Sequence, residues 1–440
     1  MTTTETEPGP ADPASASTDI VTDDSIGAGA DVQRRGGRME FLDALRGLAA
    51  MLVVLQHVGE QLSFRYRVFT TEWFRPGELG VVLFFLCSGF IIPASIERYG
   101  SVGRFWIGRF FRLYPMYWAA MGAAFLLDYR YHRYSVGQPT DGKFHLVLTN
   151  ATMVERMLRS PMWTGAAWSL AYEVVFYLLI TALFLAGVYR RSVRLAIVAM
   201  VVTVVTAAFK ASAYTSIGNQ GRHGVAWMIG AFVVLLGVLV IFGRMSAGRT
   251  LAVAALLALI VPLVANRNDA LWFAFLLFTT MFVGTVLYRA TQGELPWRTA
   301  LALVGALCVV TVFTWGRAIV PYADPATGAR ISWHGESLTF IAAFAIFGLG
   351  LLLREQRFPW VARELGRVSY SLYLVHPLLI HSIHPFEGDK PLTAAVWIGG
   401  SLAVSMVTYR LIEQPAIALG RRASARWSRR ATPVVSAAAP

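Results

Sequence analysis

The sequence predicts an all-α protein, a polytopic transmembrane helix bundle of about 10–12 helices. Three observations predict this fold class. Only 15% of the 440 residues are charged and 56% are hydrophobic, whereas soluble domains carry about 25% charged residues. The mean hydropathy is +0.53. The apolar residues also form long runs, which excludes a soluble enzyme, a fibrous protein and a secreted disulfide scaffold.

The apolar runs follow one another along the chain with lengths that suit membrane spans. A helix that crosses roughly 30 Å of hydrocarbon needs about 20 residues. We expect helices centred on residues 41–62, 79–96, 113–128, 168–188, 194–212, 225–242, 250–265, 270–288, 299–316, 337–353, 367–384 and 393–412. Several runs have only 16–18 residues, so a count of ten or eleven is also compatible with the sequence.

The two ends of the chain differ from this central region in composition. Residues 1–38 are rich in Thr, Ala, Pro, Asp and Glu, and residues 421–440 combine Arg with Ser, Ala and Pro. Such segments bury too little apolar surface to order themselves, and the first lacks the apolar run of a signal peptide. We expect disordered cytoplasmic tails on either side of one membrane domain, residues 39–420.

Basic residues are concentrated in alternate loops between the predicted helices. The richer set comprises Arg98, Arg104, Arg109, Arg112, Arg190, Arg191, Arg194, Arg244, Arg249, Arg289, Arg298, Arg354, Arg357, Arg363 and Arg367. The positive-inside rule places these loops and both termini in the cytoplasm, and it exempts the long segment 129–167. The net charge of +13 therefore indicates membrane orientation, and we expect no nucleic-acid partner.

The first apolar segment contains the ionisable residues Asp43, Arg46 and His57. Such groups are costly at membrane depth and are candidates for function. Arg46 and His57 are 11 residues apart, which places them within about 20° of one helix face and about 16 Å apart along it. This spacing suits a cation that holds an anionic group at the membrane edge and a base that acts deeper, as an acyl thioester on a pantetheine arm requires. The alternative is a snorkelling Arg46 paired with Asp43, and a hydrogen-bonded core histidine.

Two further motifs allow a structural or a functional interpretation. Ser88 and Gly89, in the run CSGFII, permit close helix packing. Arg109 and Arg112 lie one turn apart just before Pro115. Two such arginines can clamp phosphates through bidentate bonds, but they also suit a positive-inside stop signal.

Glu173 lies about one turn inside the segment 168–188, beside Trp168 and Tyr172. An unpaired carboxylate would be costly there, so we expect it to orient a histidine or to bind a hydroxyl. The aromatic residues also fit an interfacial belt.

The segment 367–384 contains Ser371 and three histidines, of which His376 lies at mid-depth before Pro377. His381 and His384 lie near the outer surface, and this pair lacks a carboxylate at ligand spacing, so we expect no metal site. Cys87 and Cys308 lie inside apolar runs, and we expect neither a disulfide nor a thiolate metal site from them.

Taken together, these motifs resemble the integral-membrane acyltransferase family 3, the O-acyltransferases of bacterial surface sugars and of some antibiotics. The matches keep one order from Glu40 to Pro415: FLDALRGLAA and, as in the family, ten residues between Arg46 and His57, then Ser88-Gly89-Phe90, Arg109-x-x-Arg112-Leu-Tyr-Pro115, Trp168-Ser169-Leu-x-x-Glu173, Ser369-Tyr-Ser371-Leu-Tyr-Leu-Val-His376-Pro, and Glu413-Gln-Pro415. Position 108 is Gly, where the family often has another basic residue, so the clamp rests on Arg109 and Arg112.

The resemblance implies a multi-pass protein of the plasma (inner) membrane that uses cytoplasmic acyl-CoA, as acetyl-CoA, and binds no permanent cofactor. The acceptor would be a hydroxyl of a surface glycan, a glycolipid or a macrolide. We expect His57 to act as general base, Arg46, Arg109 and Arg112 to hold the CoA phosphates, and Glu173 and His376 to position the acceptor or stabilise charge. Direct transfer and a covalent acyl-enzyme on His57 or a serine are both open.

A transporter or flippase for a sugar or a lipid-linked substrate is the alternative from another class, because buried charges also serve as relays. Such a protein has no need of the basic donor loop. A non-catalytic scaffold would leave the buried ionisable residues unexplained.

Overall fold

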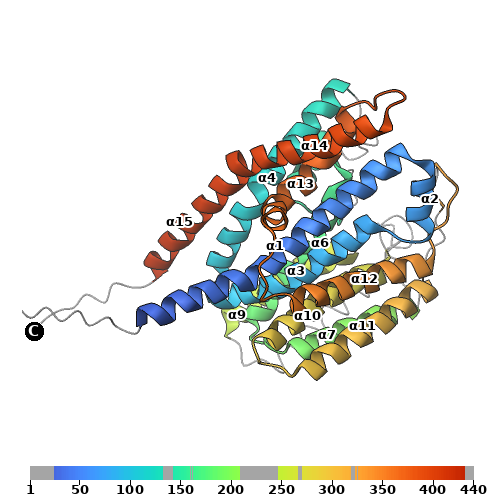
Figure 1. The fold of residues 1–440 in the computed structure, drawn as a ribbon. Helices are drawn as coiled ribbons and strands as arrows, with labels where there is room; N and C mark the ends of the chain where they lie inside the picture. Colours follow the sequence, from blue (N-terminus) through green and yellow to red (C-terminus); the bar gives the residue numbers. More distant parts are fainter. Residues whose placement is uncertain are drawn as a thin grey trace, which may run out of the picture.

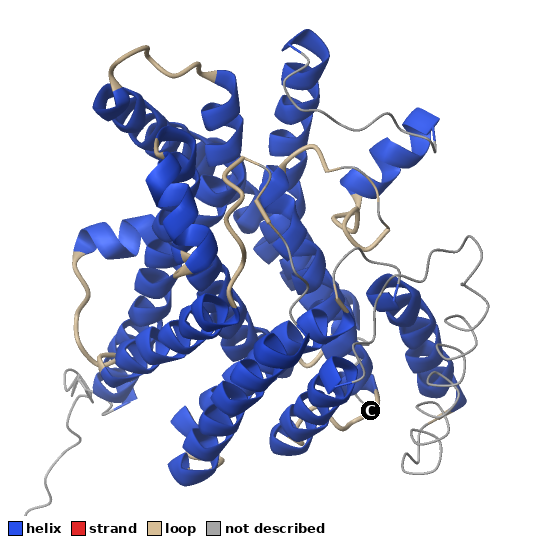
Figure 2. Ribbon diagram, turned by 90° about the vertical axis from the view of Figure 1, so that its right-hand side faces the viewer, coloured by secondary structure: helices blue, strands red, loops and turns tan. Residues whose placement is uncertain are grey.

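The computed structural model describes residues 24–131, 142–158, 160, 162–208, 246–265, 270–318, 323–324 and 326–431. Throughout these ranges the chain is helical, with no strand and one isolated β-bridge between Ala323 and Arg330. Figure 1 shows the helices side by side in one bundle, and Figure 2 views it from the end that carries α2. The all-α prediction is confirmed.

The helices are α1 (Asp24–Leu62), α2 (Phe64–Glu72), α3 (Pro76–Tyr99), α4 (Val102–Tyr131), α5 (Gly142–Ala151), a 3-10 turn η1 (Gly165–Ala167), α6 (Trp168–Leu185), α7 (Ser192–Ala208), α9 (Ala247–Ala265), α10 (Leu271–Thr291), α11 (Trp297–Ala318), α12 (Trp333–Leu352), α13 (Trp360–Ser382), α14 (Lys390–Thr408), a π-helical turn η2 (Tyr409–Glu413) and α15 (Gln414–Ala431). Each predicted apolar segment falls on one of these helices, apart from 225–242, which lies outside the described residues.

Seven stretches of the described chain are long and apolar enough to cross a membrane: Glu40–Leu62, Pro76–Tyr99, Gly165–Leu185, Leu271–Thr291, Trp297–Ala318, Trp333–Leu352 and Lys390–Trp427. The shorter helix α7 and the first part of α9 are also apolar. Helices α4 and α13 are as long but less apolar, because α4 carries Arg109 and Arg112 and α13 carries Arg363 and Arg367. The protein is a polytopic membrane bundle.

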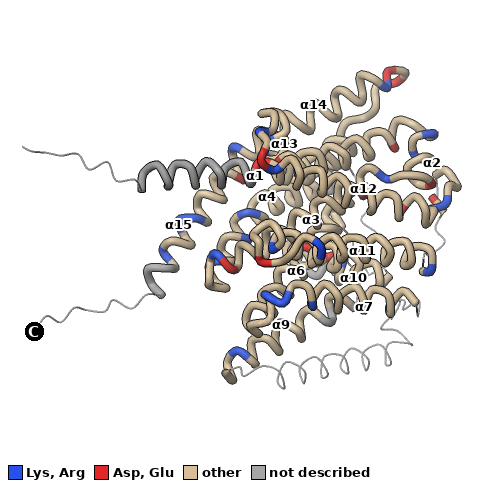
Figure 3. The backbone as a smooth tube through the Cα atoms, turned by 60° about the horizontal axis from the view of Figure 1, so that its bottom comes forward, with Lys and Arg blue, Asp and Glu red and all other residues tan. Residues whose placement is uncertain are grey.

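In Figure 1, α1 begins and α15 ends at the same end of the bundle, here called the terminal end, and α2 lies at the opposite end. Charged residues lie toward both ends, with a largely uncharged stretch between them (Figure 3). The structure departs from the predicted tails: the backbone of α1 is helical from Asp24, and α15 continues to Ala431. Helix α15 packs along α4, where the Trp427 indole covers Gly103, and this apolar contact explains the added helix.

Glycines bring the central helices unusually close together. A Cβ at Gly366 of α13 would clash with the Asp43 backbone of α1, and one at Gly47 would lie 2.8 Å from the Gly366 nitrogen. On the other side of α3, a Cβ at Gly89 would clash with the Met281 backbone of α10. Small residues at helix crossings are a usual device in membranes, so α1, α3, α10 and α13 form a closely packed centre.

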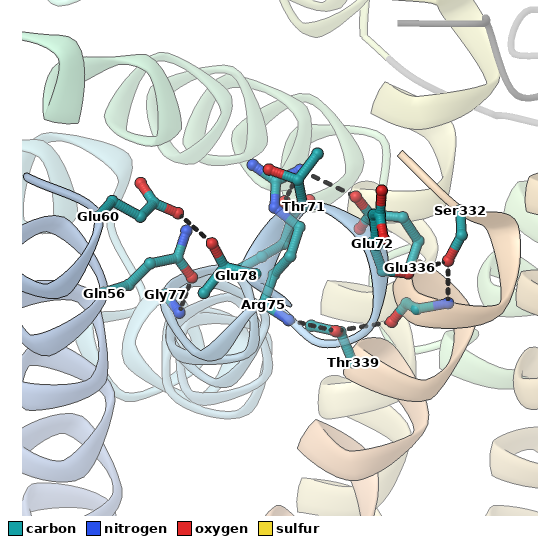
Figure 4. A network of polar contacts seen from close by, with 12 residues as sticks. Gln56, Glu60, Thr71, Glu72, Arg75, Gly77, Glu78, Ser332, Glu336 and Thr339 are labelled. Carbon is teal, nitrogen blue, oxygen red and sulfur yellow. Dashed lines mark hydrogen bonds and ion pairs between the residues drawn. The ribbon is translucent and has the colours of Figure 1, made fainter. Parts of the chain in front are cut away.

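A polar network ties the opposite end together (Figure 4). Arg75, just before α3, donates to Glu336 of α12 at 2.8 Å and lies 3.1 Å from Glu78. Gln56 of α1 accepts from the Gly77 backbone N–H at 2.6 Å. These contacts fix the start of α3 and the start of α12 around the part of α1 that also carries His57.

Candidate active site

A cavity of about 370 Å³ opens among α1, α3, α4, α6, α13 and α15 in the terminal half of the bundle. Its lining includes seven residues that the sequence singled out: Asp43, Arg46, Ser88, Arg109, Arg112, Ser169 and Glu173. They come from four helices and from positions up to 130 residues apart in the chain. The helices bring together most of the predicted site.

Guanidinium groups dominate the charge of this cavity. Arg98, Arg109, Arg112 and Arg421 line it together with Arg46. Arg109 donates to Ser95 Oγ at 2.7 Å and lies over the Phe105 and Tyr177 rings. Within the described part of the chain, neither Arg46 nor Arg112 has a carboxylate at ion-pair distance. These side chains therefore offer N–H donors to an anionic ligand.

Glu173 binds hydroxyl groups. Its Oε1 accepts from Ser88 Oγ at 2.9 Å and from Tyr177 Oη at 2.6 Å, which links α3 to α6. Two donors compensate part of the cost of burying a carboxylate. Of the two partners that we expected for Glu173, the structure provides hydroxyls and no histidine.

His57 and His376 form a direct pair, although 319 residues separate them. His57 Nδ1 lies 2.9 Å from His376 Nε2, and the rings are nearly parallel, with 11° between their planes. His376 is fully buried, whereas His57 is half-buried. The close contact of α1 with α13 brings the two rings together.

The hydrogen bonds of this pair define its tautomers. The Leu372 carbonyl, 3.1 Å from His376 Nδ1, can only accept, so His376 Nδ1 carries the proton. Nε2 of the neutral His376 ring is then an acceptor, and His57 Nδ1 donates to it. His57 Nε2 is left unprotonated. The arrangement thus provides a basic nitrogen whose ring is oriented by a second histidine.

The histidine pair does not line the cavity that holds the arginines. The Phe84 and Tyr373 rings line that cavity and meet in an edge-to-face contact, with centroids 5.7 Å apart. The Tyr373 ring lies 6.0 Å from that of His376. His57 instead interacts electrostatically with Arg75 and His381 toward the opposite end. We call Phe84 and Tyr373 the aromatic wall.

Three further predicted site residues also lie outside the cavity lining. Gly89 is a packing position against α10, and its carbonyl accepts from Thr285 Oγ1 at 2.8 Å. Trp168 packs edge-on against Tyr172. Ser371 donates to Glu413 Oε2 at 2.8 Å. Glu413 ends the π-helical turn η2, and such turns are frequent at functional sites.

Sequence reasoning missed both residues of the aromatic wall. Tyr373 lies one helical turn before His376, and that spacing was an available signal. Phe84 had none, because one Phe in an apolar helix looks like any lipid-facing or core residue. In the described ranges, no group of three or more His, Cys, Asp or Glu side chains is placed to hold a metal ion.

A cavity with cationic walls lies near an oriented histidine pair inside the helix bundle, an arrangement typical of a membrane-bound enzyme. The chain belongs to the acyltransferase 3 family, because a family model described as an acyltransferase domain matches residues 39–241 and 224–410. It is also 27% identical over 403 residues to acyltransferase MdmB of Streptomyces mycarofaciens, covering 85% of this chain and 88% of that protein. No solved structure gives a significant match.

The resemblance drawn from the motifs is therefore confirmed, and the protein is an acyltransferase. The transporter and scaffold alternatives are set aside by the same findings.

Proposed function

We propose that this enzyme is an O-acyltransferase that moves an acetyl group from cytoplasmic acetyl-CoA to a hydroxyl of a sugar-bearing acceptor: a surface glycan, a glycolipid or a macrolide. The observation that carries this proposal is the arginine-lined cavity, whose lining residue Tyr373 contacts His376, the hydrogen-bond partner of His57. The basic terminal end would face the cytoplasm of a plasma membrane, in line with the positive-inside rule.

The cavity suits the donor in charge and in length. CoA carries a pyrophosphate and a 3′-phosphate, and Arg46, Arg109 and Arg112 offer donors for both groups. A charge-assisted hydrogen bond contributes about 1.5–3 kcal/mol, so each arginine accounts for roughly 10–150-fold in donor affinity. The rise of about 16 Å from Arg46 to His57 leaves room for an extended pantetheine arm.

His57 Nε2 serves as the general base in this proposal. It takes the proton of the acceptor hydroxyl while the oxygen attacks the thioester carbonyl carbon, and a C–O bond forms. The tetrahedral intermediate collapses, the C–S bond breaks, and the CoA thiolate leaves with the proton from His57. His376 keeps His57 in the required tautomer and stabilises its transient positive charge.

The two substrates would approach the aromatic wall from its two sides. His57 is half-buried and lies five residues before the end of α1, next to α2, so the acceptor reaches it from there. The donor fills the cavity up to Phe84 and Tyr373. The Phe84 ring must rotate before the hydroxyl can meet the carbonyl, which also keeps water from the thioester until an acceptor is bound.

The test uses purified protein in nanodiscs with acetyl-CoA and a panel of methyl glycosides and macrolides, and measures CoA release. His57→Ala should lower kcat by about 10²–10⁴-fold and leave CoA binding intact. His334→Ala, an exposed histidine stacked on Trp333, is the matched control. Full activity of the His57→Ala enzyme would contradict the base assignment.

A further inference from the structure

The hydroxyl of Tyr373 lies in a chemically distinctive place. Tyr373 is 4% exposed, yet it lines the arginine-rich cavity at the aromatic wall. Its Oη lies 2.8 Å from Ser169 Oγ in the first turn of α6, and Ser169 lines the same cavity. The Ser169–Tyr373 pair therefore places a buried hydroxyl at the edge of the cavity that the acyl group of a bound donor would reach.

The hydrogen-bond pattern leaves the Tyr373 proton available for a ligand. Either hydroxyl can donate in the Ser169–Tyr373 contact, and when Ser169 donates, the Tyr373 O–H is directed elsewhere. Tyr370, one turn earlier on α13, differs because its Oη donates to the Leu113 carbonyl at 2.9 Å. Tyr177 likewise donates to Glu173. Tyr373 is bonded to a hydroxyl that can take the donor role itself.

Acyl transfer needs such a donor. When an alcohol attacks a thioester, the carbonyl electrons move onto oxygen, and a pre-placed hydrogen-bond donor stabilises the charge that develops there. The arginines lie with the phosphates in the proposed mechanism, and His57 is occupied with the acceptor proton. The reaction therefore needs a further hydrogen-bond donor, close to the aromatic wall, for the carbonyl oxygen.

We infer that Tyr373, oriented by Ser169, donates a hydrogen bond to the thioester carbonyl oxygen and stabilises the oxyanion during acyl transfer. The inference rests on the proposed function. Tyr373 keeps its proton throughout: the hydrogen bond strengthens as the C–O bond forms and weakens when the C–S bond breaks and the carbonyl returns. The proton released by the acceptor passes through His57 to the CoA thiolate. Ser169 is a positioning residue.

The experiment compares three variants in the CoA-release assay, using acetyl-CoA and whichever acceptor of the panel the wild-type enzyme acetylates. Tyr373→Phe should lower kcat by about 10²–10³-fold and leave both the KM for acetyl-CoA and the Kd for CoA within about twofold. Ser169→Ala should lower kcat by about tenfold. Tyr288→Phe, at a tyrosine of α10 outside the cavity lining, should stay within about twofold of wild type.

The outcomes separate the two proposals. A Tyr373→Phe enzyme with wild-type kcat, while wild type transfers acetyl groups, overturns the role of Tyr373 and leaves the proposed function in place. A fall in kcat accompanied by an equal loss of CoA binding also overturns it, because that pattern indicates a structural role. Wild-type protein that binds no CoA and acetylates no acceptor refutes the proposed function itself.

Discussion

Glu155, between α5 and α6, makes the stability of this protein dependent on pH. Its side chain is fully buried and accepts a hydrogen bond from Tyr117 Oη at 3.3 Å through Oε2, while Oε1 is buried with no hydrogen-bond partner in the part of the chain that the structure describes. Burial raises the pKa of this carboxyl from 4.5 to about 7. Because the folded state binds the proton more tightly, stability is greatest below pH 4.5 and falls as the pH rises toward 7.

The magnitude follows from the size of this shift. One pKa unit corresponds to about 1.36 kcal/mol, so the difference between 4.5 and about 7 is worth about 3 kcal/mol. Glu155→Gln, which is neutral at every pH, should come within about 1 kcal/mol of wild type at pH 5 and unfold a few degrees higher at pH 8.

Thermal unfolding in nanodiscs, followed by tryptophan fluorescence at one scan rate from pH 5 to pH 8, measures this difference. Glu355→Gln is the control, because that carboxylate is 79% exposed and should leave the pH dependence unchanged. Parallel pH curves for wild type and Glu155→Gln would refute the reasoning.

Three further predictions concern the histidine pair, the aromatic wall and the helix contact. His376→Ala leaves His57 Nδ1 without its hydrogen-bond acceptor. In the CoA-release assay it should lower kcat by about 10²-fold or more, with an unchanged KM for acetyl-CoA. An unchanged kcat would contradict the tautomer argument. Phe84→Ala should raise acetyl-CoA hydrolysis in the absence of acceptor, since water then passes the wall, and hydrolysis at the wild-type rate would count against a barrier there. Gly366→Ala forces a Cβ against the Asp43 backbone and should destabilise the protein by about 1–3 kcal/mol, which would be measured as a lower Tm. An unchanged Tm would show that α1 and α13 can move apart without loss of stability.

The sequence predicted the helices and most of the charged residues of the site for one physical reason. An ionisable side chain inside an apolar run is exceptional, so Arg46, His57, Glu173 and His376 stand out without knowledge of the fold. Helical periodicity then placed Arg46 and His57 on one face of α1. The structure places Arg46 in the cavity lining and His57 against His376, outside that lining.

The parts that sequence reasoning could not provide depend on which faces of distant helices meet. Helical periodicity assigns a face within one helix and says nothing about its partner, so the 2.9 Å contact of His57 with His376 had no signal in the chain. The same holds for Ser371 with Glu413 and for Ser169 with Tyr373. A neutral residue such as Phe84 acquires a role in the site only through its contacts with residues of other helices.

The aromatic wall has a consequence for the membrane as well as for the chemistry. A cavity that enters from one end and a histidine accessible from the other would, if continuous, give protons and small ions a path across the bilayer. In the proposed mechanism Phe84 and Tyr373, which meet edge to face, would close that path, so that the protein would open to one compartment at a time. In the proposed reaction only the acetyl group would then cross the membrane. The cell would keep its ion gradients while the enzyme modifies molecules outside.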